Sequence, residues 1–215
     1  MADTDLTQHD DASVADDAVA RPLTDRALGL VLLLGGLVGL VGSAALAIER
    51  YLTLVDPSHV PSCSLNALLT CSPAMDSAAG SLFGFPNPYL GLGAFPVVMT
   101  IGVLLLVAPG VALPRWFWRA FLAVATAGMA LVVFLVWTSV AELRALCPYC
   151  MVVWFSTLPV WWYVLVRNIE AGLAGGAPTS VLVRMRGWVL AALYLVLVAV
   201  LVVGLGPTLL STLRG

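Results

Sequence analysis

The sequence predicts an all-α fold, a polytopic membrane helix bundle in which a four-helix core is followed by a fifth transmembrane helix. Of the 215 residues, 61% are hydrophobic and only 10% are charged, which is too little charge for the surface of a soluble domain. The apolar residues come in runs of about twenty, the helix length that crosses roughly 30 Å of hydrocarbon. The charge distribution shows no basic patch, so nothing indicates nucleic-acid binding.

Five membrane spans are expected, at about 27–48, 89–108, 117–140, 148–166 and 188–206. Charged or turn-forming residues mark their ends: Arg26 and Glu49 flank the first span, and Pro109 ends the second. The Gly- and Ala-rich stretch 168–187 is expected to be a cytoplasmic linker, and 188–215 the fifth helix with a C-terminal tail.

Residues 1–22 are polar and acidic and contain no aromatic side chain, a composition typical of a disordered tail. A secretory signal would begin with a basic region and end at a small-residue cleavage site. This start is acidic, and the first apolar run is about twenty residues long. The first span is therefore expected to stay uncleaved behind a disordered cytoplasmic tail.

Two glycines in the first span, Gly35 and Gly39, have the small-xxx-small spacing that permits close contact between membrane helices. Glycine is also frequent in membrane helices generally. The spacing therefore leaves open whether these two residues form one packing face.

Arginine placement predicts the orientation of the bundle, because cytoplasmic segments carry an excess of positive charge. With five spans the two termini face opposite sides, and a cytoplasmic N-terminus puts seven arginines inside and three outside. The inside set is Arg21, Arg26, Arg115, Arg119, Arg167, Arg184 and Arg186, and the outside set is Arg50, Arg144 and Arg214. We therefore expect the N-terminus inside, with the loop 49–88 and the turn before the fourth span outside.

In this orientation all four cysteines lie on the oxidising, extracytoplasmic side. Cys63 and Cys71 are in the loop 49–88, and Cys147 and Cys150 open the fourth span as Cys-Pro-Tyr-Cys. Cys147 is expected at a helix N-cap with Cys150 one turn later, where side chains three apart are neighbours. A thiol at a helix N-terminus tends to have a depressed pKa, which favours the reactive thiolate. The two pairs could therefore exchange a disulfide.

Other roles for the thiols are possible on sequence alone. Two stabilising disulfides are one, although a bridge between residues three apart closes almost no loop and stabilises little. A zinc or copper site is another, but the two pairs are far apart in the chain, and we expect no metal. Transport is disfavoured because the predicted spans contain no Asp, Glu, Lys or His, and their one arginine, Arg119, lies near the start of the third span.

A dithiol pair that is oxidised repeatedly needs an electron acceptor. The chain contains no haem motif, dinucleotide fingerprint or iron–sulfur spacing, whereas a quinone dissolved in the membrane can reach a bundle laterally. Cys150, one turn into the fourth span, suits contact with such a ring. Aromatic residues near that depth are Phe83, Phe85, Tyr89, Trp137, Trp154 and Phe155. Any one of them could equally belong to an interfacial aromatic belt.

At these positions the chain resembles the vitamin K epoxide reductase (VKOR) family in its bacterial, stand-alone form. The resemblance rests on the loop pair Cys63 and Cys71 and on the Cys-x-x-Cys at the outer start of the fourth span, and it covers about 27–167. It implies a VKOR-like four-helix membrane core at 23–167. The DsbB-like family of quinone-coupled thiol oxidases places its Cys-x-x-Cys in the first outer loop, the reverse of the order here.

The resemblance implies a role for each thiol. Cys63 would exchange with a soluble partner through a mixed disulfide, and Cys71 would pass electrons on to Cys147. Cys150 would lie beside the quinone and form a charge-transfer or covalent adduct with it.

The resemblance also implies quinone contacts. Ser77 matches a serine near the family's redox centre and Asn87 an asparagine that bonds a quinone carbonyl, although both read as turn residues from sequence alone. Trp154 stands where vertebrate members have a tyrosine, and an indole donates one hydrogen bond and accepts none. With the rings of Phe83 and Trp137, these residues are the candidate quinone contacts.

These features predict a thiol oxidoreductase of the bacterial inner membrane. It would reoxidise a periplasmic, DsbA-like thioredoxin-fold partner, which we expect to be a separate protein, and pass the electrons to menaquinone or ubiquinone. Quinone coupling of this kind sustains disulfide formation in exported proteins. Two alternatives stay open: reduction of vitamin K quinone or its epoxide as the physiological role, and a structural or metal-binding membrane protein with two disulfides.

Overall fold

The chain folds as an all-α bundle, as the sequence predicts. A computed structural model describes residues 23–66, 68–173 and 181–214. It contains five helices long and apolar enough to cross a membrane: α2 (Asp25–Val55), α4 (Pro88–Val107), α5 (Arg115–Thr138), α6 (Pro148–Glu170) and α8 (Arg186–Arg214). The shorter segments are α3 (Ser72–Asp76), η1 (Ala78–Ser81), η2 (Ser139–Leu143) and α7 (Val181–Arg184). The predicted tail 1–22 and the centre of the predicted linker lie outside the described residues.

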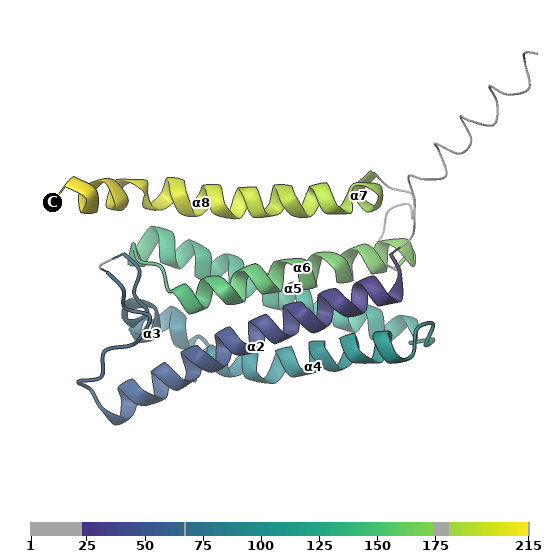
Figure 1. Cartoon of the computed structure of the whole chain (residues 1–215), viewed down its shortest axis with the longest axis horizontal. Helices are drawn as coiled ribbons and strands as arrows, with labels where there is room; N and C mark the ends of the chain where they lie inside the picture. Colours follow the sequence, from purple (N-terminus) through teal and green to yellow (C-terminus); the bar gives the residue numbers. More distant parts are fainter. Residues whose placement is uncertain (1–22, 67, 174–180, 215) are drawn as a thin grey trace, which may run out of the picture.

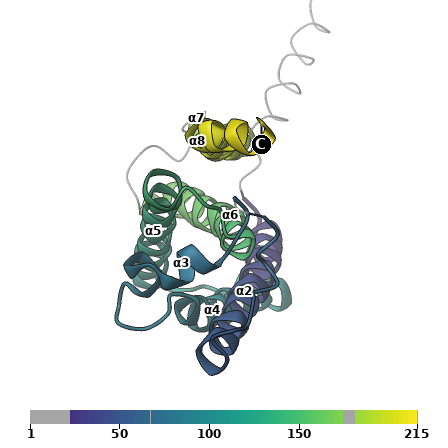
Figure 2. The same ribbon diagram turned by 90° about the vertical axis from the view of Figure 1, so that its left-hand side faces the viewer.

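Four of the long helices surround a common centre, as Figure 2 shows in a view along the bundle. α2 packs closely against both α4 and α6, and α5 packs against α6. The first and last core helices are therefore neighbours. α8 lies outside this group, alongside α6 and the π-helical segment η2 (Figure 1).

α2 is longer than the predicted first span. It begins after Thr24, whose side chain accepts a hydrogen bond of 3.2 Å from the backbone N–H of Ala27. The helix continues to Val55, and Pro57 follows soon after it. Its 31 residues span about 46 Å, which exceeds the roughly 30 Å of the hydrocarbon layer. The helix therefore continues through residues 49–55, the first part of the predicted loop 49–88.

Glycine lets α2 approach two neighbours on different faces. A Cβ at Gly35 would lie 2.7 Å from the Val160 side chain on α6. A Cβ at Gly39 would instead overlap the ring of Phe95 on α4. The two glycines therefore do not form a single packing face, because α2 is wedged between α4 and α6.

Nearer the start of α2, this helix and α4 touch backbone to backbone. A Cβ at Gly102 on α4 would lie 2.7 Å from the backbone nitrogen of Leu33 and 2.9 Å from the carbonyl oxygen of Gly29. Neither atom can move aside without displacing a helix. The contact therefore fixes the two helices relative to each other.

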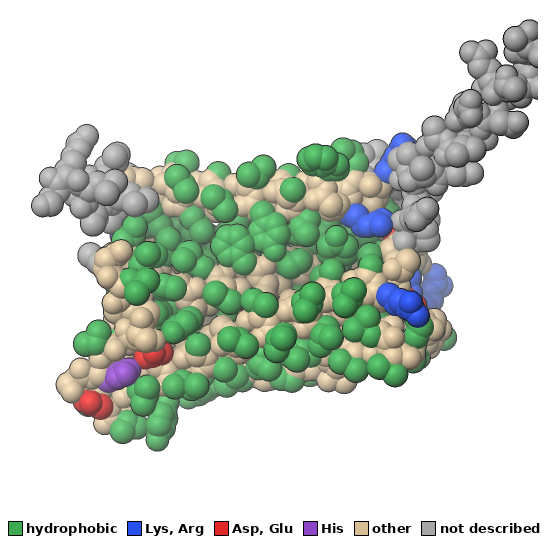
Figure 3. Space-filling model, viewed as in Figure 1, with side chains coloured by type: hydrophobic (Ala, Val, Ile, Leu, Met, Phe, Trp, Pro, Cys, Tyr) green, Lys and Arg blue, Asp and Glu red, His purple; other side chains and the backbone are tan. Residues whose placement is uncertain are grey.

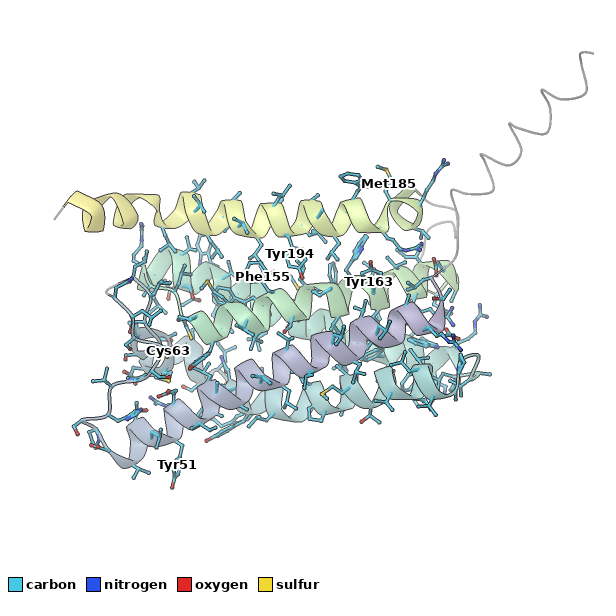
Figure 4. All side chains as sticks on the ribbon, viewed as in Figure 1. Tyr51, Cys63, Phe155, Tyr163, Met185 and Tyr194 are labelled. Atoms are coloured by element: carbon cyan, nitrogen blue, oxygen red, sulfur yellow. A yellow bond between two sulfur atoms is a disulfide. The ribbon has the colours of Figure 1, made fainter. Side chains whose placement is uncertain are left out.

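α8 is joined to the core through α6. The hydroxyl of Tyr194 donates a hydrogen bond of 2.7 Å to the carbonyl of Phe155, and the two rings stack with centroids 5.5 Å apart (Figure 4). The ring N–H of Trp162 on α6 donates to the carbonyl of Arg186 at 2.9 Å. On its outer side Val203 is 78% exposed, as expected for a face in contact with lipid.

The two ends of the bundle differ in charge. Arginine side chains gather at the end where α2 begins, and acidic and histidine side chains are seen at the other end (Figure 3). The latter also carries Cys63 (Figure 4), and we call it the cysteine end. At the opposite end, the Arg167 guanidinium lies 5.3 Å from the centre of the Trp118 ring and 3.5 Å from the Asp25 carboxylate.

Candidate redox site

The loop between α2 and α4 folds back across the cysteine end of the bundle, where α3 covers the centre (Figure 2). Part of this loop pairs with the segment before α6. The N–H of Thr70 donates to the carbonyl of Leu146 at 2.9 Å, and the N–H of Leu146 donates to the carbonyl of Leu68 at 2.8 Å. Because Cys71 follows Thr70 and Cys147 follows Leu146, this pairing brings the two cysteines together.

The four cysteines gather at this end. Cys63 and Cys71 form a disulfide, with their Cα atoms 5.8 Å apart. The sulfur of Cys71 lies 3.0 Å from the sulfur of Cys147, and Cys147 and Cys150 are free thiols. Cys63, Cys71 and Cys147 are 3%, 0% and 1% exposed. The disulfide and the first thiol of the Cys-x-x-Cys motif therefore form one buried sulfur cluster.

The contact between Cys71 and Cys147 permits thiol–disulfide exchange. In such an exchange a thiolate attacks one sulfur of a disulfide and the other sulfur leaves. Attack by Cys147 on Cys71 would release Cys63, and the reverse reaction would restore the Cys63–Cys71 bond. The arrangement can therefore move a disulfide between the two pairs in either direction.

Cys147 is the N-cap of α6, with Pro148 in the first turn, as predicted. The backbone N–H of Cys150 donates a hydrogen bond of 3.3 Å to its sulfur. Hydrogen bonding from the side chain of Cys150 lowers the pKa of Cys147 below the usual thiol value, although burial acts in the opposite direction. Donors at a helix N-terminus stabilise a thiolate, so Cys147 is suited to attack a disulfide or to leave one.

A cavity of about 600 Å³ lies among α2, α4, α5 and α6. Its walls are almost entirely apolar, with side chains such as Leu131 and Val132 on α5. This volume is in the range of pockets that bind small molecules. Cys150 is partly exposed and lines the cavity, whereas Cys147 lies outside it. The two thiols of the motif therefore have different surroundings, the cavity for Cys150 and the sulfur cluster for Cys147.

Three of the residues predicted as quinone contacts line the same cavity: Ser77, Asn87 and Trp154. Trp154 is one turn after Cys150 on α6, where side chains four apart share a face, and it is 2% exposed. The cavity thus brings together residues from the loop and from α6 that are far apart in the chain.

Ser77 and Asn87 also hold the turn that leads into α4. The hydroxyl of Ser77 donates to the carbonyl of Ala74 at 2.9 Å and accepts from a backbone N–H of η1 at 3.1 Å. The amide of Asn87 donates to the carbonyl of Ala79 at 2.7 Å and accepts from the N–H of Leu82 at 3.2 Å. The single hydrogen of Ser77 is therefore in use, whereas the Asn87 amide has a second hydrogen that could serve a ligand.

The other two predicted contacts, Phe83 and Trp137, do not line this cavity. Phe83 is 60% exposed and stacks on Phe85 with ring centroids 6.3 Å apart. Trp137 on α5 is 65% exposed. Both positions suit the alternative interpretation of an interfacial aromatic belt. As placed here, neither ring reaches the cavity.

Sequence reasoning missed a polar network beside the sulfur cluster. The carboxylate of Glu49, near the end of α2, lies 2.9 Å from the ring nitrogen of His59. It also accepts hydrogen bonds from the backbone N–H of Ser62, at 3.2 Å, and from the Ser62 hydroxyl. That hydroxyl lies 2.9 Å from the hydroxyl of Tyr149, inside the Cys-Pro-Tyr-Cys motif. A glutamate at the edge of an apolar span was the available signal, but its partners depend on how the loop folds.

Among the described residues, no group of three or more His, Cys, Asp or Glu side chains is arranged to hold a metal ion.

Among protein families, the vitamin K epoxide reductase family matches residues 30–165. The match covers more than half of the chain and includes all four cysteines. No curated protein and no solved structure matches this chain.

Proposed function

The chain belongs to the vitamin K epoxide reductase family of membrane thiol oxidoreductases, and we propose that it reoxidises a soluble thioredoxin-fold partner and passes the electrons to a quinone. One observation carries the proposal, the contact of 3.0 Å between the sulfurs of Cys71 and Cys147. It joins a disulfide in the loop to a motif whose second thiol, Cys150, lines an apolar cavity.

The proposed cycle starts with both pairs as disulfides. A thiolate of the reduced partner attacks the sulfur of Cys63, the Cys63–Cys71 bond breaks, and Cys71 leaves as a thiolate. The second thiol of the partner then attacks the partner's own sulfur in the mixed disulfide. The partner departs oxidised, Cys63 is released, and two electrons have entered the loop pair.

The next step moves these electrons to the Cys-x-x-Cys motif. The thiolate of Cys71 attacks the sulfur of Cys147, the Cys147–Cys150 bond breaks, and Cys150 leaves as a thiolate facing the cavity. Cys63 then attacks Cys71, which re-forms the loop disulfide and releases Cys147. The product has the arrangement described above, a Cys63–Cys71 disulfide beside two free thiols.

The residues around the cavity fit a quinone. The walls are apolar, and a volume of about 600 Å³ accommodates a ring with part of an isoprenoid chain. A quinone bound there would accept two electrons and two protons, which restores the Cys147–Cys150 disulfide. The second amide hydrogen of Asn87 would bond a carbonyl oxygen, and the buried indole of Trp154 would form the wall next to Cys150.

We place the protein in the inner membrane of a bacterium with its N-terminus in the cytoplasm. The arginine distribution supports this orientation, and so does the gathering of arginine side chains at the end opposite the cysteine end (Figure 3). The sulfur cluster would then face the periplasm, where DsbA-like oxidases form disulfides in exported proteins.

The proposal is tested with the purified chain in lipid, a reduced DsbA-like protein as donor and menaquinone or ubiquinone as acceptor. We expect one quinone to be reduced for each donor oxidised. Cys150→Ala should slow quinone reduction by more than about a hundredfold, while the donor still forms a mixed disulfide with Cys63. Donor oxidation without quinone reduction in the wild type, or full quinone reduction by Cys150→Ala, would contradict the proposal.

A further inference from the structure

The disulfide sulfur that the partner attacks in the proposed function is buried. Cys63 is 3% exposed, although an attacking thiolate has to reach its sulfur. It lies in one cluster with Leu46, Met75, Cys71 and Cys147, whereas Val60 in the preceding segment 56–62 is 73% exposed. Cys63 therefore has to leave this cluster before it can react, and the segment 56–62, which we call the covering segment, has to move with it.

One carboxylate fixes the covering segment to α2. The side chain of Glu49 is 10% exposed and holds the segment at two points. His59 lies 2.9 Å from one carboxylate oxygen, and Ser62 donates to the other through its N–H, at 3.2 Å, and through its hydroxyl. A carboxylate removed from water needs donors to meet its charge, and here the covering segment supplies them.

The same hydrogen bonds reach the Cys-x-x-Cys motif. The hydroxyl of Ser62 lies 2.9 Å from that of Tyr149, and Tyr149 packs against the sulfur cluster. Because Ser62 directly precedes Cys63, its contacts with Glu49 and Tyr149 fix the backbone beside the disulfide.

Cys71 is held by a separate set of contacts. Its neighbour Thr70 is bonded to Leu146 through the backbone at 2.9 Å. On its other side, α3 is tied to α2 by the ion pair between Asp76 and Arg50, at 2.7 Å. Loss of the Glu49 contacts would therefore free the Cys63 side of the disulfide and leave Cys71 in place.

We propose that Glu49 is a positioning residue that holds the covering segment in place and so keeps Cys63 in its buried position, and that the soluble partner has to displace His59 and Ser62 from this carboxylate before exchange. The inference rests on the proposed function for the identity of the partner. A cleft of about 370 Å³ beside His59 and Pro61, lined also by Asp76, gives the partner a place to engage the segment.

Closure has a consequence for specificity. A small thiol has little binding energy with which to open the segment, whereas a protein partner can use its contacts with the loop to do so. The disulfide would therefore react with its proper partner and resist small thiols.

The test uses the full chain and dithiothreitol as a probe. A dithiothreitol thiolate attacks Cys63, Cys71 leaves, and the second thiol of the probe closes a ring and releases Cys63. The rate of Cys63–Cys71 reduction, followed by the mass added on alkylation, should rise about tenfold in Glu49→Ala. Glu49→Gln keeps a neutral acceptor, so it should raise the rate about threefold.

Asp56→Asn is the matched control. Its carboxylate also belongs to the covering segment, but it bonds Ser58 at 2.9 Å and 2.6 Å through the backbone N–H and the hydroxyl. These bonds stay within the segment, so dithiothreitol should reduce the Cys63–Cys71 disulfide of this variant at the wild-type rate.

A second measurement separates an opened segment from a loosened fold. In a Cys63→Ala, Cys150→Ala background, Cys71 and Cys147 can bond only to each other, and diamide should join them at the same rate with and without Glu49→Ala. An unchanged dithiothreitol rate in Glu49→Ala overturns the inference. A parallel fall in Cys71–Cys147 bonding also overturns it, because the whole site would then have loosened.

Neither measurement requires a quinone or a partner. If the Glu49 variants show the expected rates of disulfide reduction but the wild type reduces no quinone, the proposed function is contradicted and the role of Glu49 is supported. If the wild type reduces quinone but the Glu49 variants show unchanged rates of disulfide reduction, only the role of Glu49 is contradicted.

Discussion

The backbone N–H of Cys150 donates a hydrogen bond of 3.3 Å to the sulfur of Cys147. This bond favours the thiolate of Cys147, and the dipole of α6 acts in the same direction. The side chain of Cys150 provides the largest influence that lowers the pKa of Cys147, and burial opposes it. Within the motif, Cys150 is therefore the hydrogen-bond donor and Cys147 the acceptor.

This asymmetry predicts a pH profile for the attack of Cys147 on Cys71. The attack needs the thiolate, so its rate should be constant above the pKa of Cys147 and fall as the pH drops through that value. Because this pKa is lowered, the fall should begin below the ordinary thiol range near about 8.5. The rate is measured as Cys63 released in Cys150→Ser, which keeps a hydroxyl donor, by acid quenching and alkylation.

Cys150→Ala is the comparison for this profile. It lacks the side-chain donor, so the midpoint of the same measurement should move to a higher pH. Identical midpoints in the two variants would show that the side chain of Cys150 does not set the pKa of Cys147.

A bulky side chain in the cavity should weaken quinone binding. Gly128 on α5 lines the cavity, and a Cβ there would have nothing within 4 Å. Gly128→Phe should therefore fill the space without disturbing the helices and raise the KM for quinone about tenfold. Exchange between the loop pair and the motif, measured by alkylation, should be unchanged.

Gly93→Phe on α4 is its control. A Cβ at Gly93 also meets open space, but this residue does not line the cavity, so KM should stay at the wild-type value. If Gly128→Phe binds quinone as tightly as Gly93→Phe does, the quinone site is elsewhere.

The backbone contact between α2 and α4 should be sensitive to a single methyl group. In Gly102→Ala the new Cβ would lie 2.7 Å from the backbone nitrogen of Leu33, so we expect a loss of about 1–3 kcal/mol in the free energy of unfolding. Gly93→Ala, in the same helix and unobstructed, should be neutral or slightly stabilising. Thermal unfolding midpoints in one detergent compare the two, and equal midpoints would contradict the packing argument.

Accessibility labelling tests the orientation in the membrane. In a chain without its native cysteines, Val60→Cys at the cysteine end should react with an impermeant maleimide in intact cells. Ala112→Cys, in the turn between α4 and α5, should react after permeabilisation. The opposite pattern would invert the topology and put the sulfur cluster in the cytoplasm.

The spans were predictable because apolar runs of this length have few uses other than crossing a bilayer. The end of α2 was not. The residues from Arg50 to Val55 suit either a helix or a loop. Their environment includes the pair of Arg50 with Asp76, at 2.7 Å, a contact that no local pattern reveals.

In the candidate site, too, some features could be predicted from the sequence and others could not. That the thiols share one side followed from the arginines, whereas the family resemblance and not the spacing suggested that Cys71 meets Cys147. The depth of Trp137 in the membrane could be estimated from its place in the span. The direction in which its side chain points could not be predicted, because a helix that is apolar all round gives no sign of which face turns inward. The contact of Tyr149 with Ser62 depended on the fold of the loop.

A sulfur atom in a disulfide has only two bonds, one to carbon and one to sulfur. Cys71, bonded to Cys63 and 3.0 Å from Cys147, can therefore be joined to one of them at a time. In the proposed cycle, the connection to the water-soluble side and the connection to the membrane interior are then mutually exclusive. Electrons would pass in pairs through the thiol–disulfide exchanges, and Cys71 would never be bonded to Cys63 and Cys147 at the same time.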